Sequence, residues 1–97
     1  MTDSWFTYSN QSKQVTDWTV DYEEVFNLTP TESHRQQAQF DVGATLQIQV
    51  GIQAPIYRLT LTLTGDGWTK NTGANSRFVL SQTKDTVTVA FVEEPPA

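Results

Sequence analysis

Residues 45–64 constrain the fold most, because apolar and polar side chains alternate along two consecutive runs separated by a proline. The first run is TLQIQVGI and the second is YRLTLTLT. Successive side chains of a β-strand point to opposite faces, so a period of two is typical of strands with one dry face and one wet face. The runs therefore predict an antiparallel hairpin with an apolar face and a Thr/Gln face. An isolated hairpin is marginally stable, so other strands must cover its apolar face.

Other segments alternate in the same way and supply those strands. Each of five further ranges predicts a strand: residues 4–9, 14–20, 37–42, 77–82 and 86–93. Threonine and valine are plentiful, and these β-branched residues suit a pleated sheet and lose rotamer freedom in a helix. Composition and periodicity therefore both predict an all-β protein.

Three stretches are less regular. Residues 22–28 alternate imperfectly and predict a strand with a bulge or a strand end, with one helical turn as the alternative. Residues 31–36, TESHRQ, are strongly polar and predict a loop, and residues 70–76 have loop composition. The strand predicted after the first of these loops carries three apolar residues on one side, Ala38, Phe40 and Val42.

Six to eight short strands with turns every eight to twelve residues predict one antiparallel β-sandwich domain over residues 1–94, with a small β-barrel as the alternative. The cysteine–tryptophan–cysteine pattern and the tyrosine corner of immunoglobulin domains are absent, so the prediction concerns architecture and not that family. Residues 95–97, Pro-Pro-Ala, predict a frayed tail, because proline donates no backbone hydrogen bond to a sheet.

The amino-acid composition excludes or disfavours several classes of function. The 97 residues contain no cysteine, which excludes disulfides, thiolate metal sites and cysteine nucleophiles. Eleven acidic residues against six basic ones give a formal charge of −5, which disfavours direct binding to a nucleic-acid backbone. The first ten residues are polar, and no apolar run approaches 18 residues. These features predict a soluble protein without a membrane span. The expected location is the cytoplasm, or the host cytoplasm if the protein is virus-encoded.

Acidic residues gather in the first third of the chain, where Lys13 is the one basic residue up to position 32. The hypothesis is an acidic surface that binds a basic partner protein, such as the nucleic-acid groove of an enzyme. The alternative is a solvated surface that keeps a small domain soluble. The predicted partner-binding residues are Asp17, Asp21, Glu23, Glu24 and Glu32.

Aromatic residues make up 11% of the chain and suggest a second hypothesis, a carbohydrate-binding module. Exposed indole rings stack on sugars, and binding residues often lie on loops held by a rigid scaffold. Trp68 follows a Gly-Asp-Gly turn and precedes an asparagine-rich loop, although tryptophans also pack in cores. The ligand-binding residues of this alternative are Asp66, Trp68, Asn71 and Asn75.

Catalysis and metal binding have little support in the sequence. His34 is the single histidine and is expected to be an exposed loop residue. One histidine without cysteine does not support a zinc site, and no calcium-binding loop motif is present. No cofactor is expected. The sequence therefore favours a non-catalytic, protein-binding β-sandwich, such as an inhibitor encoded by a phage or mobile element, or an assembly subunit. Its oligomeric state stays open, since sheet edges allow self-association.

Overall fold

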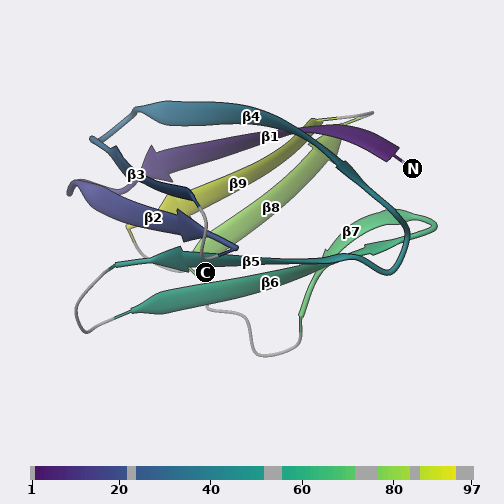
Figure 1. The fold of residues 1–97 in the computed structure, drawn as a ribbon. Helices are drawn as coiled ribbons and strands as arrows, with labels where there is room; N and C mark the ends of the chain where they lie inside the picture. The colour runs from purple at the N-terminus through teal and green to yellow at the C-terminus, as the bar shows by residue number, and fades with distance from the viewer. Residues whose placement is uncertain (1, 22–23, 52–55, 72–76, 84–85, 94–97) are drawn as a thin grey trace.

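The computed structural model describes residues 2–21, 24–51, 56–71, 77–83 and 86–93. These residues form β-strands joined by turns, in two sheets packed face to face (Figure 1). The strands in chain order are β1 (Thr2–Gln11), β2 (Thr16–Val20), β3 (Glu24–Leu28), β4 (Ser33–Phe40), β5 (Thr45–Val50), β6 (Tyr57–Thr64), β7 (Gly67–Lys70), β8 (Phe78–Thr83) and β9 (Thr86–Val92).

One sheet has four strands in the order β4-β1-β9-β8, and the other has five in the order β3-β2-β5-β6-β7. All neighbouring strands pair antiparallel except β1 and β9, which are parallel. The predicted hairpin is confirmed, because β5 pairs with β6 from Thr45↔Thr62 to Val50↔Tyr57. Both sheets end in edge strands, so the predicted sandwich is confirmed and the barrel alternative is not adopted.

The core fills the space between the sheets with the apolar side chains of the alternating strands. In β2 the burial pattern alternates strictly, and the Trp18 side chain is 0% exposed. Full burial of one large apolar side chain stabilises the fold by about 1.5–3 kcal/mol, so this layer supplies most of the driving force. The core contains Phe6, Tyr8, Trp18, Val20, Leu28, Leu46, Ile48, Val50, Leu59, Leu61, Leu63, Trp68, Phe78, Val87, Val89 and Phe91.

Three features differ from the predictions. Residues 33–36 belong to β4 and not to a loop, because inward and outward positions alternate along the whole strand from Ser33 to Phe40. The Val42 side chain is 67% exposed, since the chain leaves one sheet after β4 and joins the other at β5, with Gly43 at φ 99° in between. The short strand β7 was not predicted and brings the described strands to nine.

A buried asparagine ties the two sheets together where β1 ends. Asn10 is 0% exposed, and its Nδ2 donates to the carbonyl oxygens of Gln14 (2.7 Å) and Leu28 (2.9 Å). Its Oδ1 accepts from the backbone N–H (3.0 Å) and the Oγ (2.7 Å) of Ser12. All four hydrogen-bonding positions of the amide are therefore satisfied by the protein, as burial of an asparagine requires.

One open side of the sandwich is closed by side chains that bridge β7 and β8. The Gln82 amide accepts from the Trp68 N–H at 2.8 Å and donates to the Trp68 carbonyl. On the same pair of strands, Lys70 Nζ donates to the Phe78 carbonyl at 3.3 Å. The edges of β7 and β8 are thus partly occupied by the protein itself.

Candidate functional site

A cleft of about 250 Å³ opens on the other side of the sandwich, between β4 and the ends of β2 and β5. The aromatic residues at its floor pack closely: the Phe6 ring lies 5.8 Å from the Phe40 ring, edge to face, and 6.1 Å from the Tyr8 ring. The second sheet contributes its wall from β2 and β5. The lining residues are Phe6, Tyr8, Val20, Asp21, Gln36, Ala38, Gln39, Phe40 and Leu46.

The cleft lies beside the second half of β4, because β3 covers only the first half (Figure 1). At that first half, the Phe26 ring stacks on His34 with 4.3 Å between centroids. β3 begins at Glu24 and pairs Glu24 with Val20, so its described backbone goes no further toward the cleft. The arrangement of short β3 beside long β4 therefore leaves a hollow that the sequence pattern gave no sign of.

A buried hydrogen-bond acceptor without a partner distinguishes this cleft. Within the described residues, Gln36 Oε1 is inaccessible to solvent and accepts no hydrogen bond. An unsatisfied buried polar group costs about 1–3 kcal/mol, so native structures contain few of them. Because this oxygen is inaccessible to solvent, a donor that enters the cleft reaches it only when the Gln36 side chain turns toward the opening, and the new bond would then remove the penalty.

Asp21 carries the acidic group of the cleft and is held in an uncommon backbone conformation. Its φ is 51°, in the left-handed region, which aspartate tolerates better than most residues. Two hydrogen bonds to β5 fix it: its N–H donates to the Gln47 carbonyl at 2.8 Å, and its Oδ1 accepts from the Gln47 N–H at 3.0 Å. The described part of the chain offers no bond to Oδ2, which is left able to accept from a ligand.

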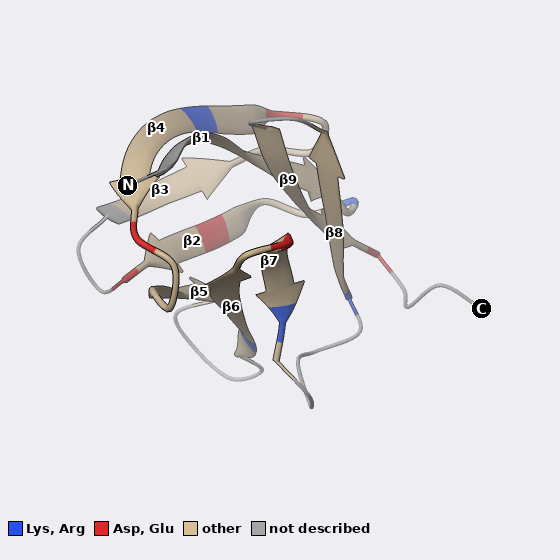
Figure 2. Cartoon of the chain, turned by 90° about the vertical axis from the view of Figure 1, so that its right-hand side faces the viewer, with Lys and Arg blue, Asp and Glu red and all other residues tan. Residues whose placement is uncertain are grey.

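The predicted acidic residues do not form one compact patch. Asp17 Oδ1 accepts from the Asn27 side chain on the outer face of the β2–β3 pair. Glu32 Oε1 accepts from the Thr29 N–H in the turn before β4, at the opposite end of β2–β3 from Asp21. Figure 2 shows acidic positions on β2 and on separate turns. Glu23 and the Glu24 side chain lie outside the described residues.

The residues of the carbohydrate alternative are also separated. Trp68 is 3% exposed and packs edge to face against Phe6 (5.4 Å) and Phe40 (5.0 Å), so it is a core residue and offers no ring to a sugar. Asp66 is exposed in the β6–β7 turn, and Asn71 Oδ1 accepts from the Thr60 N–H at 3.0 Å. Asn75 lies outside the described residues. The carbohydrate hypothesis thereby loses its stacking ring.

His34 is not the exposed loop residue that was predicted. It lies in β4, is half-buried, and stacks on Phe26 and, at 6.4 Å, on Tyr8. Inner and outer positions alternate along the whole of β4. The first two inner residues, His34 and Gln36, are polar, so this alternation was not recognised in the sequence before Ala38. Among the described residues, no three His, Asp or Glu side chains gather in a way that suits a metal ion.

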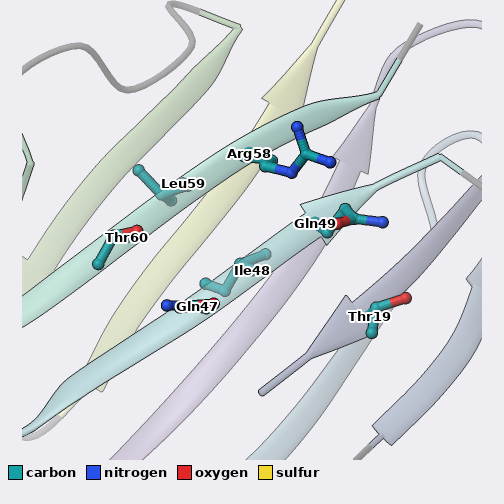
Figure 3. Close-up of a pocket in the computed structure, with 7 residues that line it drawn as sticks. All are labelled: Thr19, Gln47, Ile48, Gln49, Arg58, Leu59 and Thr60. Carbon is teal, nitrogen blue, oxygen red and sulfur yellow. The ribbon is translucent and has the colours of Figure 1, made fainter. Parts of the chain in front are cut away.

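Two further hollows are weaker candidates. The first is a shallow depression of about 40 Å³ on the Thr/Gln face, where Figure 3 shows polar side chains on β2, β5 and β6. This volume is well below the roughly 300–1,000 Å³ of small-molecule pockets. The second, about 190 Å³, contains Arg77, whose guanidinium lies over Phe91 (4.2 Å) and Tyr57 (4.9 Å) and whose Nε donates to the Val92 carbonyl at 2.7 Å. Internal contacts thus occupy this arginine.

The described residues include no helix long and apolar enough to cross a membrane. Comparison with known proteins gave no further assignment: no family model matches the chain, and neither does any curated protein or any solved structure.

Proposed function

We propose that this protein is a non-catalytic binding module that receives an extended segment of a partner protein along the outer edge of β4. The observation that carries the proposal is the regularity of this edge. β4 pairs with β1 at eight consecutive positions, from Thr2↔Phe40 to Ser9↔Ser33, without a bulge. Addition of a strand to such an edge is a common mode of peptide recognition, in which main-chain hydrogen bonds supply affinity.

The direction of the backbone groups along β4 follows from one hydrogen bond. The Asn10 N–H donates to the Glu32 carbonyl across the β1–β4 pair. Antiparallel bonds recur at every second residue, so the N–H and C=O groups of Gln36 and Ala38 point to β1, and those of Arg35, Gln37 and Gln39 point outward. Three successive outward pairs of groups are therefore arranged as a template for another strand.

The other edge strands are less suitable. The edge of β3 has five residues and that of β7 has four. β8 is bridged to β7 by Gln82 and Lys70. Edge strands are commonly protected by lysine, proline or a bulge, and β4 has none of these. Its one charged residue, Arg35, lies over the Trp5 ring at 4.2 Å on the outer face.

Charge favours a basic partner. The formal charge of −5 attracts a cationic surface, and Asp21 places a carboxylate at the cleft next to the β4 edge. Of the predicted acidic residues, we assign Asp21 to the partner site, while Asp17 and Glu32 contribute through the overall field. The partner decides whether this module acts as an inhibitor or as an assembly subunit.

A proline at Gln37 tests the proposal. Because the Gln37 N–H points outward, Gln37→Pro should leave the β1–β4 pairing intact and remove a donor from the edge. Gln37→Ala is the matched control, since it changes the same side chain and keeps the N–H. A partner captured from native lysate with the wild-type protein should also bind Gln37→Ala and should lose at least tenfold in affinity for Gln37→Pro.

Folding and self-association are measured on the same variants. Circular dichroism should show that Gln37→Pro keeps the β-sheet spectrum. Sedimentation separates a second copy of this chain from a different protein as the strand that adds to β4. Equal partner binding by a folded Gln37→Pro variant would overturn the proposal.

A further inference from the structure

We infer that the cleft beside β4 accepts a lysine or arginine side chain from the segment that lies along the β4 edge. For the identity of that segment the inference rests on the proposed function. The chemistry of the cleft itself is independent of it and is tested separately below.

The geometry of strand addition brings a side chain of the partner to the cleft. A strand added to β4 lies about 4.8 Å beyond it, and its side chains alternate between the two faces of the extended sheet. Those on the inner face continue the row formed by Gln36, Ala38 and Phe40, all of which line the cleft. Since β3 covers only the first half of β4, an inner side chain opposite the second half points toward the ends of β2 and β5.

The polar groups of the cleft favour a side chain that donates hydrogen bonds. Asp21 has an oxygen able to accept another bond, and Gln36 Oε1, which is buried without a partner within the described residues, becomes a second acceptor when its side chain turns toward the cleft. No lysine or arginine is among the lining residues. The charged groups of lysine and arginine carry only hydrogen-bond donors, so they match a site whose unpartnered groups are hydrogen-bond acceptors.

The apolar groups of the cleft suit the rest of such a side chain. Phe6, Phe40 and Leu46 form a floor along which a chain of methylene groups can pack while the charged group stays at the polar rim. A cleft of about 250 Å³ has room for one long side chain and is small for a separate ligand of drug size. Size and polarity together therefore favour one cationic side chain.

The backbone of Asp21 shows that its carboxylate is held in place before binding. A residue in the left-handed region persists only where the surrounding structure fixes it, and such residues cluster at binding sites. The two bonds to Gln47 provide that fixation. A carboxylate fixed in advance loses less conformational entropy when a cation binds.

Small cations test the cleft without a protein partner. We expect n-butylguanidinium and n-butylammonium, titrated into ¹⁵N-labelled protein, to shift the amide resonances of Ala38, Leu46 and Gln47. The uncharged analogue n-butanol should give shifts at least fivefold smaller at equal concentration. The two cations separate an arginine site from a lysine site, and binding by either one supports the inference.

Variants identify the groups responsible. Asp21→Asn keeps a residue that tolerates positive φ and removes the charge, so it should weaken n-butylguanidinium binding at least fivefold. Asp66→Asn is the matched control, because it removes the same charge from an exposed residue that does not line the cleft, and it should change binding by less than twofold. Ala38→Leu, which adds bulk to the cleft, should abolish binding.

The results for Gln37→Pro separate the two proposals. This variant should bind n-butylguanidinium like the wild type, because the cleft side chains are unchanged. Partner binding that depends on Gln37 but is indifferent to Asp21→Asn would overturn this inference and leave the proposed function standing. The absence of cleft shifts with either cation up to 100 mM, or equal shifts with n-butanol, would also overturn it.

Discussion

Replacement of Asn10 by aspartate is the sharpest test of how the two sheets are joined. The change conserves shape, but it replaces the donating Nδ2 group with an oxygen. Two donated bonds are lost, and the new oxygen faces the carbonyls of Gln14 and Leu28, which lie 2.7 and 2.9 Å from Nδ2. The two bonds from Ser12 to Oδ1 can remain. The substitution therefore isolates the donor half of the asparagine network.

The expected cost follows from these contacts. The two lost hydrogen bonds cost about 0.5–1.5 kcal/mol each, because Ser12 Oγ and Thr16 Oγ1 still lie 3.1 and 3.4 Å from the Gln14 and Leu28 carbonyl oxygens. Burial of a carboxylate against these two oxygens adds several kcal/mol more. We expect Asn10→Asp to lower the free energy of unfolding by about 4 kcal/mol or more at pH 7. A domain of this size has about 5–15 kcal/mol in total, so the loss brings the variant close to unfolding.

Urea denaturation followed by tryptophan fluorescence measures the loss, because Trp18 is buried and reports on the core. At an m-value of about 1.5 kcal/mol/M, the midpoint should fall by roughly 2–3 M. Asn71→Asp is the control for the chemical change. Asn71 is exposed, and the oxygen that accepts from the Thr60 N–H is retained, so the loss should stay below about 1 kcal/mol.

The pH dependence of the stability difference between Asn10→Asp and the wild type tests the same reasoning independently. Burial and two facing carbonyl oxygens should raise the pKa of the introduced carboxyl above its unfolded value of about 3.9. A raised pKa in the folded state means that the penalty is largest above that raised value and shrinks as the pH falls toward about 4, where the protonated group donates one bond. A loss below about 0.5 kcal/mol at pH 7, or a gap from the wild type that widens on acidification, would refute the reasoning.

Three further changes test single features of the fold, each by urea denaturation. Thr31→Gly should stabilise the protein by about 0.5–1 kcal/mol, because the β-branched Thr31 has a φ of 70°; a lower midpoint would contradict this. Gly67→Ala should destabilise by about 1–3 kcal/mol, since φ is 119° and the added Cβ would lie 2.8 Å from Gln82 Oε1. Gln82→Leu should cost about 2 kcal/mol and speed hydrogen exchange at the Trp68 amide, because both bonds to the Trp68 backbone are lost; unchanged exchange there would count against the β7–β8 bridge.

The face that each side chain occupies was largely predictable from the sequence. The alternation in residues 45–64 predicted the β5–β6 hairpin and its apolar face. The same alternation predicted the strands over residues 14–20, 77–82 and 86–93, which carry the buried side chains of Trp18, Phe78 and Val89. The prediction failed where polar residues occupy inner positions. His34 and Gln36 look like loop residues in sequence, yet both lie on the inner side of β4. The role of Asn10 in joining the sheets was not predictable either, because that role depends on its bond to Leu28, 18 residues away, and not on its local bonds to Ser12 and Gln14.

Side-chain alternation by itself determined that this chain forms a two-layered β protein, because a period of two separates a dry face from a wet one in any strand. It did not determine which strands are neighbours, since alternation is the same at a sheet edge and at its centre. Tertiary structure alone decided that the chain changes sheets between β4 and β5, that Trp68 is covered by Phe6 and Phe40, and that β4 ends its sheet beside a cleft. These outcomes depend on pairing between distant segments, which no local pattern encodes.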